Sequence, residues 1–381
     1  MKAEKIKILY TIPNFNTAGS GKALINVISK LDKRIFEPSI CCRHDKGELF
    51  KKAEELNVPI YISPFTTVVK PRLKGIRNII KLSKFFKKIN PDIIHSYNYS
   101  DDYSEGLASK LSGIKWVYTK KNMGWGSNAW KLRSKIADMI IPQNEEMIER
   151  LFYGYKKIKL IPIGFDINEF NLNGKDESVV KEFNLENSYP VIMSIANVIP
   201  IKGLDDLIKG FKLVLEDFEN AKLIIVGENR TEYAMELNSL VKSLELQGKV
   251  LFTGRKSNIN SFLSTSDLFI LSSKKTGEGG PISILESMAS GKITIGSDVP
   301  GIRDQFREFP EQLFESQNPG SIANKIINML NKSDEEKELI KRRQKEFIEK
   351  YYSIDNEVIK LQQIYIEIVK SKKNDIVIES D

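Results

Sequence analysis

The sequence predicts an α/β protein of two domains, each a doubly wound parallel sheet, that face one another across a cleft. Strand-like apolar runs alternate with helical patterns along most of the chain, which is typical of parallel sheets covered by helices. The alternation restarts near residue 190, after a polar, turn-rich segment at 164–171. A chain of 381 residues also exceeds what one hydrophobic core normally covers. We therefore expect domains at residues 1–168 and 169–353, and a C-terminal helix and frayed tail at 354–381.

The first domain is predicted to alternate seven strands with six helices. The strands are short apolar runs, expected at 6–10, 37–42, 59–62, 93–95, 116–119, 138–142 and 159–162. The helices are expected at 20–31, 47–56, 72–89, 101–111, 127–137 and 144–153. A helix between each pair of strands is the order that produces a parallel sheet.

The second domain is predicted to repeat this order. Its strands are expected at 190–195, 221–226, 250–253, 268–271 and 294–297, and its helices at 203–216, 231–246, 257–265 and 281–290. The last long helix, at 354–372, follows an equally long charged one. We expect it to cross back onto the first domain.

Composition is that of an ordinary globular protein, with 41% hydrophobic and 28% charged residues. No apolar run reaches the ~18 residues that a membrane span needs, and the first strand follows the N-terminal Met without the apolar core of a signal peptide. The two cysteines, Cys41 and Cys42, are adjacent and cannot form a disulfide framework. These features predict a cytoplasmic protein.

Positive charge is concentrated in the first domain. Residues 1–165 contain 30 of the 58 Lys and Arg but only 15 of the 50 Asp and Glu. Such an excess suits nucleic acid, an anionic membrane surface or an acidic substrate. Much of it lies in Lys70–Lys88, where apolar residues recur with helical spacing among basic ones. This segment predicts either an interfacial helix on anionic lipid, which would place the protein on the inner face of the membrane, or an ordinary surface helix with a lysine-rich solvent face.

The strongest chemical signal lies near the C-terminal third. Glu278 and Glu286 are eight positions apart across a Gly-Gly-Pro turn that directly follows an apolar strand. Pro281 suits the first turn of a helix, so Glu278 is expected before that helix and Glu286 within it. A helix N-terminus favours phosphate, and the two carboxylates can bind hydroxyls of a sugar and of a ribose. The alternative is a solvated loop glutamate and a second glutamate favoured only by the helix dipole.

The string from Glu278 to Gly291 resembles the E-x7-E motif of retaining GT-B glycosyltransferases of the family-4 type, with Ser287 where Ala is usual. The resemblance covers about residues 5–350. It implies the GT-B fold, with the nucleotide-sugar in the second domain and the acceptor in the first. It also implies transfer of a sugar from a UDP- or GDP-linked donor with retention at the anomeric carbon, and no further cofactor. The acceptor would be a glycan or a lipid-linked glycan, as in the biosynthesis of surface polysaccharides or glycoconjugates.

The resemblance assigns roles to residues of the second domain. Lys202 ends the turn after the strand at 190–195, where a lysine can neutralise a leaving diphosphate, although a plain surface lysine is the alternative. Glu278 would bind sugar hydroxyls and support the oxocarbenium-like state, and Glu286 would anchor the ribose. Asn197 stands where the family often has Arg. The remaining donor-binding residues would be Asn197, Gly227, Arg255, Ile259, Gly279, Gly280, Pro281 and Ile282.

Two sites in the first domain follow strand ends. Gly19 and Ser20 lie in a small-residue loop that opens a helix, a position resembling the Gly-rich first loop of the family, which meets the donor phosphates. The loop lacks the residues of a P-loop or a dinucleotide fingerprint. His95 resembles the first histidine of a family motif and is expected near the sugar or the acceptor, with Tyr97 in place of the second. A buried, hydrogen-bonded histidine is the alternative.

Several other functions are disfavoured. The sequence has no motif typical of a metal site, so none is expected. It has no recognisable nucleic-acid module, so no nucleic-acid partner is expected. An inactive GT-B subunit and a nucleotide-sugar 2-epimerase remain as alternatives to the transferase, and a nucleic-acid-binding protein, which salt-dependent retention on DNA would reveal, is the third.

Overall fold

The computed structural model describes residues 4–16, 18–124, 127–170 and 174–378, with residue 18 and residues 371–378 as backbone only. The chain forms two compact units, one of residues 1–164 with 354–381 and one of residues 165–353. The predicted boundary at 168/169 lies four residues too late. Phe165 N–H donates to the Tyr352 carbonyl in the second unit (2.8 Å), whereas Gly164 N–H donates to Glu357 in the first (2.6 Å).

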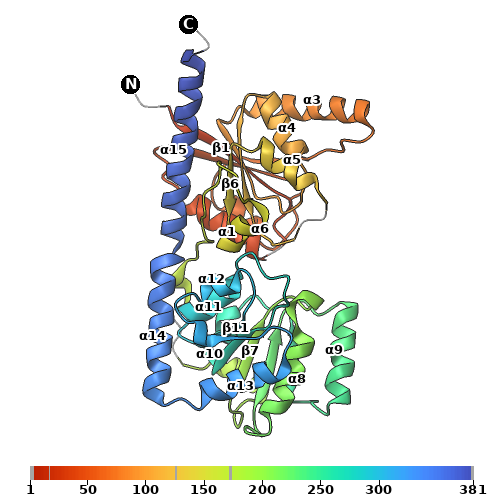
Figure 1. The fold of residues 1–381 in the computed structure, drawn as a ribbon, viewed down its shortest axis with the longest axis vertical. Coiled ribbons are helices and arrows are strands. Elements are labelled where there is room, and N and C mark those ends of the chain that lie inside the picture. The colour runs from red at the N-terminus through yellow and green to blue at the C-terminus, as the bar shows by residue number, and fades with distance from the viewer. Residues whose placement is uncertain (1–3, 17, 125–126, 171–173, 379–381) are drawn as a thin grey trace. The chain divides into compact units, whose positions relative to one another are not determined.

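The first unit contains a parallel sheet flanked by helices (Figure 1). The sheet has six strands in the order β3-β2-β1-β4-β5-β6, all parallel. Its strands are β1 (Ile6–Ile12), β2 (Phe36–Cys42), β3 (Ile60–Ile62), β4 (Ile93–Ser96), β5 (Lys115–Lys120) and β6 (Met139–Pro142). Between them run α1 (Ala18–Lys30), α2 (Phe50–Glu54), α3 (Arg72–Ile89), α4 (Ser104–Leu111) and α5 (Ala129–Ile136), and α6 (Glu145–Leu151) follows. One apolar cluster lies on each face of the sheet, which confirms the doubly wound class.

The second unit also contains a six-stranded parallel sheet, in the order β12-β11-β10-β7-β8-β9. Its strands are β7 (Val191–Ile195), β8 (Lys222–Val226), β9 (Val250–Gly254), β10 (Leu268–Leu271), β11 (Ile293–Ser297) and β12 (Leu313–Phe314). The helices are α7 (Glu177–Glu182), α8 (Leu204–Val214), α9 (Glu232–Ser243), α10 (Ile259–Thr265), α11 (Ile282–Ala289), α12 (Ile302–Gln305), α13 (Pro319–Leu330) and α14 (Asp334–Tyr351).

The structure differs from the predicted elements at a few places. The strand predicted at 159–162 is wrong: Ile158 makes a single bridge to Ile140, and Lys159 and Ile161 each donate one N–H to β6, but the segment does not form a continuous strand. The short strand β12 and helices α7, α12 and α13 are additional. The two residues of β12 pair only with Gly296 and Ser297, too short a run for an apolar pattern to reveal.

The C-terminal helix α15 (Ile354–Ile378) packs on the first unit. Val358, Leu361, Ile364, Tyr365 and Ile368 recur at helical spacing and are buried in the apolar cluster that covers α1 and β1. In the described part of the chain, no helix combines the length and the apolar character that crossing a membrane requires.

Candidate functional site

The second sheet has its topological switch point between β7 and β10. These two strands are neighbours, but the chain leaves them toward opposite halves of the sheet, to β8 and to β11. Ligands of open parallel sheets bind at the carboxyl ends of such a strand pair. The loop after β7 leads to Lys202 and the loop after β10 leads to Glu278, so both side chains belong to the edge where a ligand is expected.

Backbone contacts fix the two loops to each other. Lys274 N–H donates to the Ile201 carbonyl (2.8 Å), and Ser272 Oγ donates to the Lys202 carbonyl (2.9 Å). Gly203 has a φ of +61°, and a Cβ there would lie 2.2 Å from the Ser272 carbonyl oxygen. Only glycine fits this approach, which explains the Lys-Gly pair in physical terms.

Lys202 and Glu278 form an ion pair although 75 residues separate them in sequence. The Nζ–Oε1 distance is 2.5 Å, and the side chains are 17% and 16% exposed. Ser273 Oγ donates to the same carboxylate oxygen at 2.5 Å. The carboxylate is therefore held in one orientation while remaining accessible, as a group that contacts a ligand must be.

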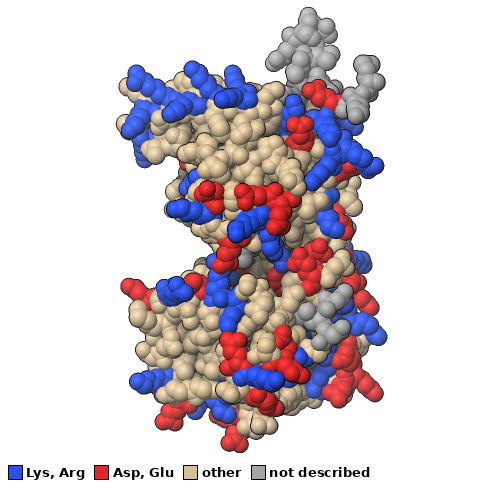
Figure 2. Space-filling view, turned by 180° about the vertical axis from the view of Figure 1, so that it is seen from behind, with Lys and Arg blue, Asp and Glu red and all other residues tan. Residues whose placement is uncertain are grey.

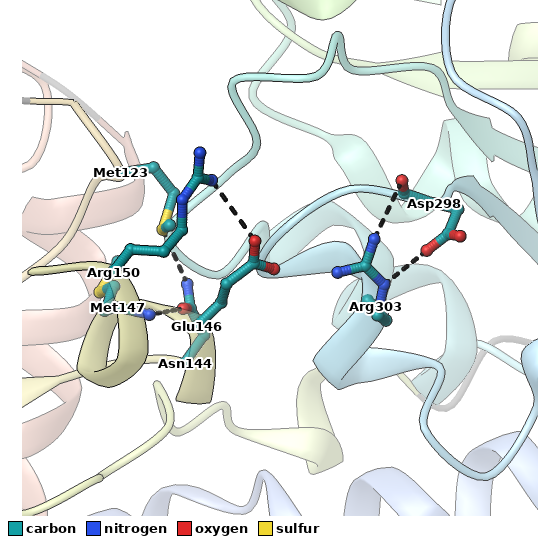
Figure 3. Close-up of polar contacts among 7 residues, drawn as sticks. All are labelled: Met123, Asn144, Glu146, Met147, Arg150, Asp298 and Arg303. Atoms are coloured by element: carbon teal, nitrogen blue, oxygen red, sulfur yellow. Dashed lines mark hydrogen bonds and ion pairs between the residues drawn. The ribbon is translucent and has the colours of Figure 1, made fainter. Parts of the chain in front are cut away.

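The far side of the Glu278 loop is held by the β11–α12 connection. Gly277 adopts a φ of +78°, and the next residue, Glu278, donates its N–H to the Pro300 carbonyl (2.8 Å). Pro300 itself lies between Asp298 and Arg303, whose carboxylate and guanidinium are 2.6 Å apart (Figure 3). The ion pair braces the connection that positions Glu278.

The helix N-terminus expected beside Glu278 is present. Helix α11 begins at Ile282, so Pro281 is the N-cap residue rather than part of the first turn as predicted. The first N–H groups of a helix lack intrahelical acceptors, and a proline side chain cannot accept from them. The Pro281 carbonyl accepts from Gln305 Nε2 (3.1 Å). Glu286 lies one turn along α11 from Ile282, and its side chain is buried.

Other predicted donor-binding residues follow neighbouring strands of the same sheet. Asn197 is exposed after β7, Arg255 is exposed after β9, and Ile259 begins α10. Gly227 follows β8, and its N–H donates to the Gly254 carbonyl (3.1 Å). A Cβ at Gly227 would lie 1.9 Å from the Ala196 carbonyl oxygen. Close backbone packing alone therefore requires this glycine.

In the first unit the switch point lies between β1 and β4, where Gly19 and Ser20 were predicted to form a loop. They lie instead in the first turn of α1, with Gly19 exposed and Ser20 half-buried. Helix α6, which follows β6, is capped by Asn144, whose Oδ1 accepts from Met147 N–H at 2.8 Å (Figure 3).

His95 lies in β4 and is fully buried. Its Nδ1 is 2.6 Å from Tyr365 Oη on α15, and its Nε2 is 2.9 Å from Thr119 Oγ1 on β5. Burial, with a smaller effect of Lys121, lowers the pKa of His95 to about 3, so the ring is neutral. Both ring nitrogens are therefore hydrogen-bonded to side chains inside the first unit. The geometry favours the buried, hydrogen-bonded histidine over a contact with sugar or acceptor. Tyr97 is buried beside it.

Models of two glycosyltransferase families match this chain. A model of glycosyl transferases group 1 matches residues 175–346, and a model of glycosyltransferase family 4 matches residues 17–169. The chain belongs to the group 1, family-4-type glycosyltransferases. The first of these matches contains every predicted donor-binding residue of the second unit.

Relatives of this glycosyltransferase act on different substrates. It is 22% identical to the Escherichia coli UDP-Gal:alpha-D-GlcNAc-diphosphoundecaprenol alpha-1,3-galactosyltransferase, over 97% of this chain and 98% of the relative. It is 29% identical to the Bacillus anthracis N-acetyl-alpha-D-glucosaminyl L-malate synthase, over 51% of this chain. The chain spans about half the length of that synthase (50%) and of an uncharacterized Methanocaldococcus jannaschii glycosyltransferase (52%).

Solved structures share the fold of this glycosyltransferase. A glycosyltransferase from Rickettsia africae ESF-5 has a TM-score of 0.83 at 22% identity, covering 96% of this chain and 99% of its own. Anabaena HepE in complex with UDP-glucose has a TM-score of 0.79 at 18% identity, covering 96% and 100%. These likenesses confirm the GT-B fold.

Sequence reasoning missed one polar cluster of the glycosyltransferase. Arg133 on α5 is fully buried, and its guanidinium carbon lies 4.8 and 4.5 Å from the ring centroids of the neighbouring Trp116 and Tyr118. Burial raises the pKa of Glu105 on α4 to about 7, against the opposing effect of Arg133. Ser96 Oγ donates to Glu105 at 2.6 Å. Both charged residues lie in segments that read as ordinary amphipathic helices, so the sequence carries no signal for this cluster.

Proposed function

We propose that this glycosyltransferase moves a sugar from a nucleoside diphosphate sugar to a hydroxyl of a glycan or lipid-linked acceptor, with retention of anomeric configuration. The bond between the anomeric carbon and the diphosphate breaks, and a bond to the acceptor oxygen forms. The acceptor proton leaves with the nucleoside diphosphate. The observation that carries this proposal is the ion pair of Lys202 and Glu278 at the switch point of the second sheet, next to the start of α11.

Lys202 is the group suited to the departing diphosphate. Its ammonium is a compact charge with three donors, and a site shielded from water strengthens its attraction to phosphate. Phosphate would replace the Glu278 carboxylate as its partner. Glu278, still oriented by Ser273, then accepts hydrogen bonds from sugar hydroxyls and stabilises positive charge that develops on the sugar ring.

The start of α11 supplies the second part of the diphosphate site. Backbone N–H groups of the first helical turn carry partial positive charge and point along the helix axis. Helical side chains lean toward the N-terminus, so Glu286 leans toward this turn from one turn below. We assign it to the ribose hydroxyls. We assign the remaining contacts with the nucleotide to Asn197, Gly227, Arg255 and Ile259.

Relatives support the substrate classes. The Escherichia coli relative is named for a UDP-galactose donor and a diphosphoundecaprenol-linked acceptor, and a Campylobacter jejuni relative at 25% identity is likewise named for a diphospho-undecaprenol acceptor. The HepE structure contains UDP-glucose. We propose a UDP-linked donor and a lipid-linked acceptor, in polysaccharide assembly at the cytoplasmic face of a membrane.

Metal independence is part of the proposal. Among the described side chains, no three or more His, Cys, Asp and Glu gather as a metal site would require. Lys202 and the N–H groups of α11 would neutralise the diphosphate in place of a metal ion. Transfer that continues unchanged in EDTA supports this point, and loss of transfer that Mg²⁺ or Mn²⁺ restores contradicts it.

The first test is thermal stabilisation by a panel of nucleoside diphosphates and their sugars. A ligand that binds only the folded state raises the free energy of unfolding by mass action, by about 2.7 kcal/mol at 100 times Kd, and Tm rises with it. We expect a shift with the uridine series that is lost in Glu286→Ala. No shift with any nucleotide would reject the transferase and favour the inactive subunit. A nucleotide shift accompanied by epimerised donor, with no acceptor needed, would favour the epimerase.

A further inference from the structure

Helix α3 carries two apolar stripes that face different directions. Leu82 and Phe86 are buried in the core of the first unit, and Ile79 packs against them. Leu73, Ile76 and Ile80 are spaced three and four residues apart, as on one helix face, and are 80%, 56% and 41% exposed. The core accounts for the first stripe, whereas the second remains on the surface.

The loop that precedes α3 is held against the helix, on the side away from these exposed residues. Val68, just before the helix, is 66% exposed, and its carbonyl accepts from Asn78 Nδ2 (3.0 Å). A Cβ at Gly75 would lie 2.2 Å from the Val69 carbonyl oxygen, so glycine there lets the preceding loop lie against the helix. We call the exposed apolar face formed by Leu73, Ile76 and Ile80 the α3 stripe.

Positive charge surrounds the α3 stripe. Residues 68–88 contain eight Lys and Arg and no Asp or Glu. Figure 2 shows these basic side chains gathered over the α3 end of the unit. At 100° per residue, Lys84, Arg77 and Lys88 follow the stripe on the side away from the core, and Arg72 borders it on the other. An apolar strip bordered by lysine and arginine is the pattern of an interfacial helix.

We infer that the α3 stripe docks on an anionic lipid surface, with its apolar side chains inserted among the acyl chains and the basic side chains at the headgroups. Charge complementarity selects this occupant, because an apolar protein partner would leave eight cations without counter-charges. The lipid-linked acceptor belongs to the proposed function, and docking would bring the enzyme to it. Docking itself requires neither donor nor acceptor, so it can be tested apart from catalysis.

A hollow of about 610 Å³ lies between the loop that leads into α3 and the ligand edge of the first sheet. Its lining includes Arg43, which follows β2, residues 66–70 of that loop, and Asp102. Arg43 donates to Thr66 Oγ1 (2.8 Å). Only this loop thus separates the carboxyl edge of the sheet, where an acceptor is expected, from the first turn of α3.

The test is sedimentation of the full chain with vesicles of phosphatidylcholine, either alone or with about one third phosphatidylglycerol. We expect binding only to the anionic vesicles, falling steeply between about 0.1 M and 1 M salt. Leu73→Ser/Ile76→Ser/Ile80→Ser should lower the partition constant at least about tenfold. Lys81→Gln/Lys84→Gln/Lys88→Gln should lower it roughly 100-fold, at about fivefold per charge.

Matched controls remove the same groups from other exposed helices. Met235→Ser/Leu339→Ser/Ile359→Ser and Lys209→Gln/Lys212→Gln/Lys242→Gln should bind like the parent. Leu73→Cys labelled with an environment-sensitive dye should shift to the blue on anionic vesicles, and labelled Met235→Cys should not. The native Cys41 and Cys42 are buried and do not compete for label.

No binding at low salt, equal binding to neutral vesicles, or equal losses in the control variants would overturn the inference. The inference would also be overturned if the lysine variant lost vesicle binding while the serine variant of the α3 stripe kept it and labelled Leu73→Cys showed no shift. The apolar side chains would then not insert. A uridine-nucleotide Tm shift that persists in each case would show that the docking inference alone has failed.

Discussion

Replacing Lys202 by alanine tests the centre of the proposed site, because it removes one partner of a partly buried ion pair. Exposed pairs contribute about 0–1 kcal/mol, and breaking a fully buried pair by removing one partner costs about 3–5 kcal/mol. With 17% and 16% of the two side chains exposed, the Lys202–Glu278 pair lies between these limits. We expect Lys202→Ala to destabilise the second unit by about 2 kcal/mol, or about 4–8 °C in Tm.

The same variant should affect catalysis more than stability. Loss of one preorganised donor to developing negative charge typically lowers kcat about 10²- to 10³-fold. We therefore expect initial rates with a UDP-sugar to fall by that factor. The Tm shift produced by UDP should fall as well, since the diphosphate loses a cationic partner. Rates and shifts are measured at a temperature where the variant remains folded.

Lys175→Ala is the matched control. Lys175 Nζ lies 3.0 Å from Asp267, with side chains 47% and 18% exposed. Asp267 precedes β10, at the edge of the sheet opposite to the site, so this variant should lose some stability and keep its rate. A rate for Lys202→Ala within threefold of the parent, with the UDP shift preserved, would refute the diphosphate role of Lys202.

Two further predictions follow from buried groups. The lowered pKa of His95, about 3 against about 6.5 unfolded, means that the unfolded state binds the proton more tightly. Stability from this residue is present above pH 6.5 and lost toward pH 3, by about 2 kcal/mol at pH 5. Urea unfolding at pH 7 and pH 5 should show this difference reduced in His95→Gln, and an unchanged difference would contradict the assignment. Gly227→Ala should cost more than about 2 kcal/mol in thermal unfolding, because its Cβ would meet the Ala196 carbonyl. Gly124→Ala, with nothing within 4 Å, is its control, and equal losses would refute the packing argument.

The sequence was sufficient to predict the fold because each element depends on a local pattern. Apolar runs such as 268–271 are buried strands within a residue or two of where they were predicted. Once strands and helices alternate, the parallel topology brings the loops after β7 and β10 to one edge. The pairing of Lys202 with Glu278 follows from that topology and from a motif in each loop. The two-residue strand β12 and the domain boundary each depend on a few hydrogen bonds to residues elsewhere in the chain, which no local pattern encodes.

The sequence could not predict the role of a side chain whose partners lie far away along the chain. His95 lies near the end of a strand and matches a family motif, yet Tyr365, 270 residues later, is hydrogen-bonded to one of its nitrogens. A motif predicts which residue type stands at a position, and packing decides whether its side chain is free to meet a ligand. Lys202 and Glu278 keep partial exposure, whereas His95 keeps none.

Helix α3 is a second case in which the sequence pattern did not decide burial. Here apolar side chains that the pattern would bury are exposed. Its apolar residues read as one amphipathic face, for which burial in a core is a sufficient explanation. The structure divides them, because the unit has room beneath the helix for Gly75, Leu82 and Phe86 but leaves Leu73 and Ile76 outside. Exposed apolar side chains at fixed helical spacing, bordered by cations alone, need a counterpart that is both apolar and anionic. A lipid surface has both properties, and the proposed lipid-linked acceptor would be found there.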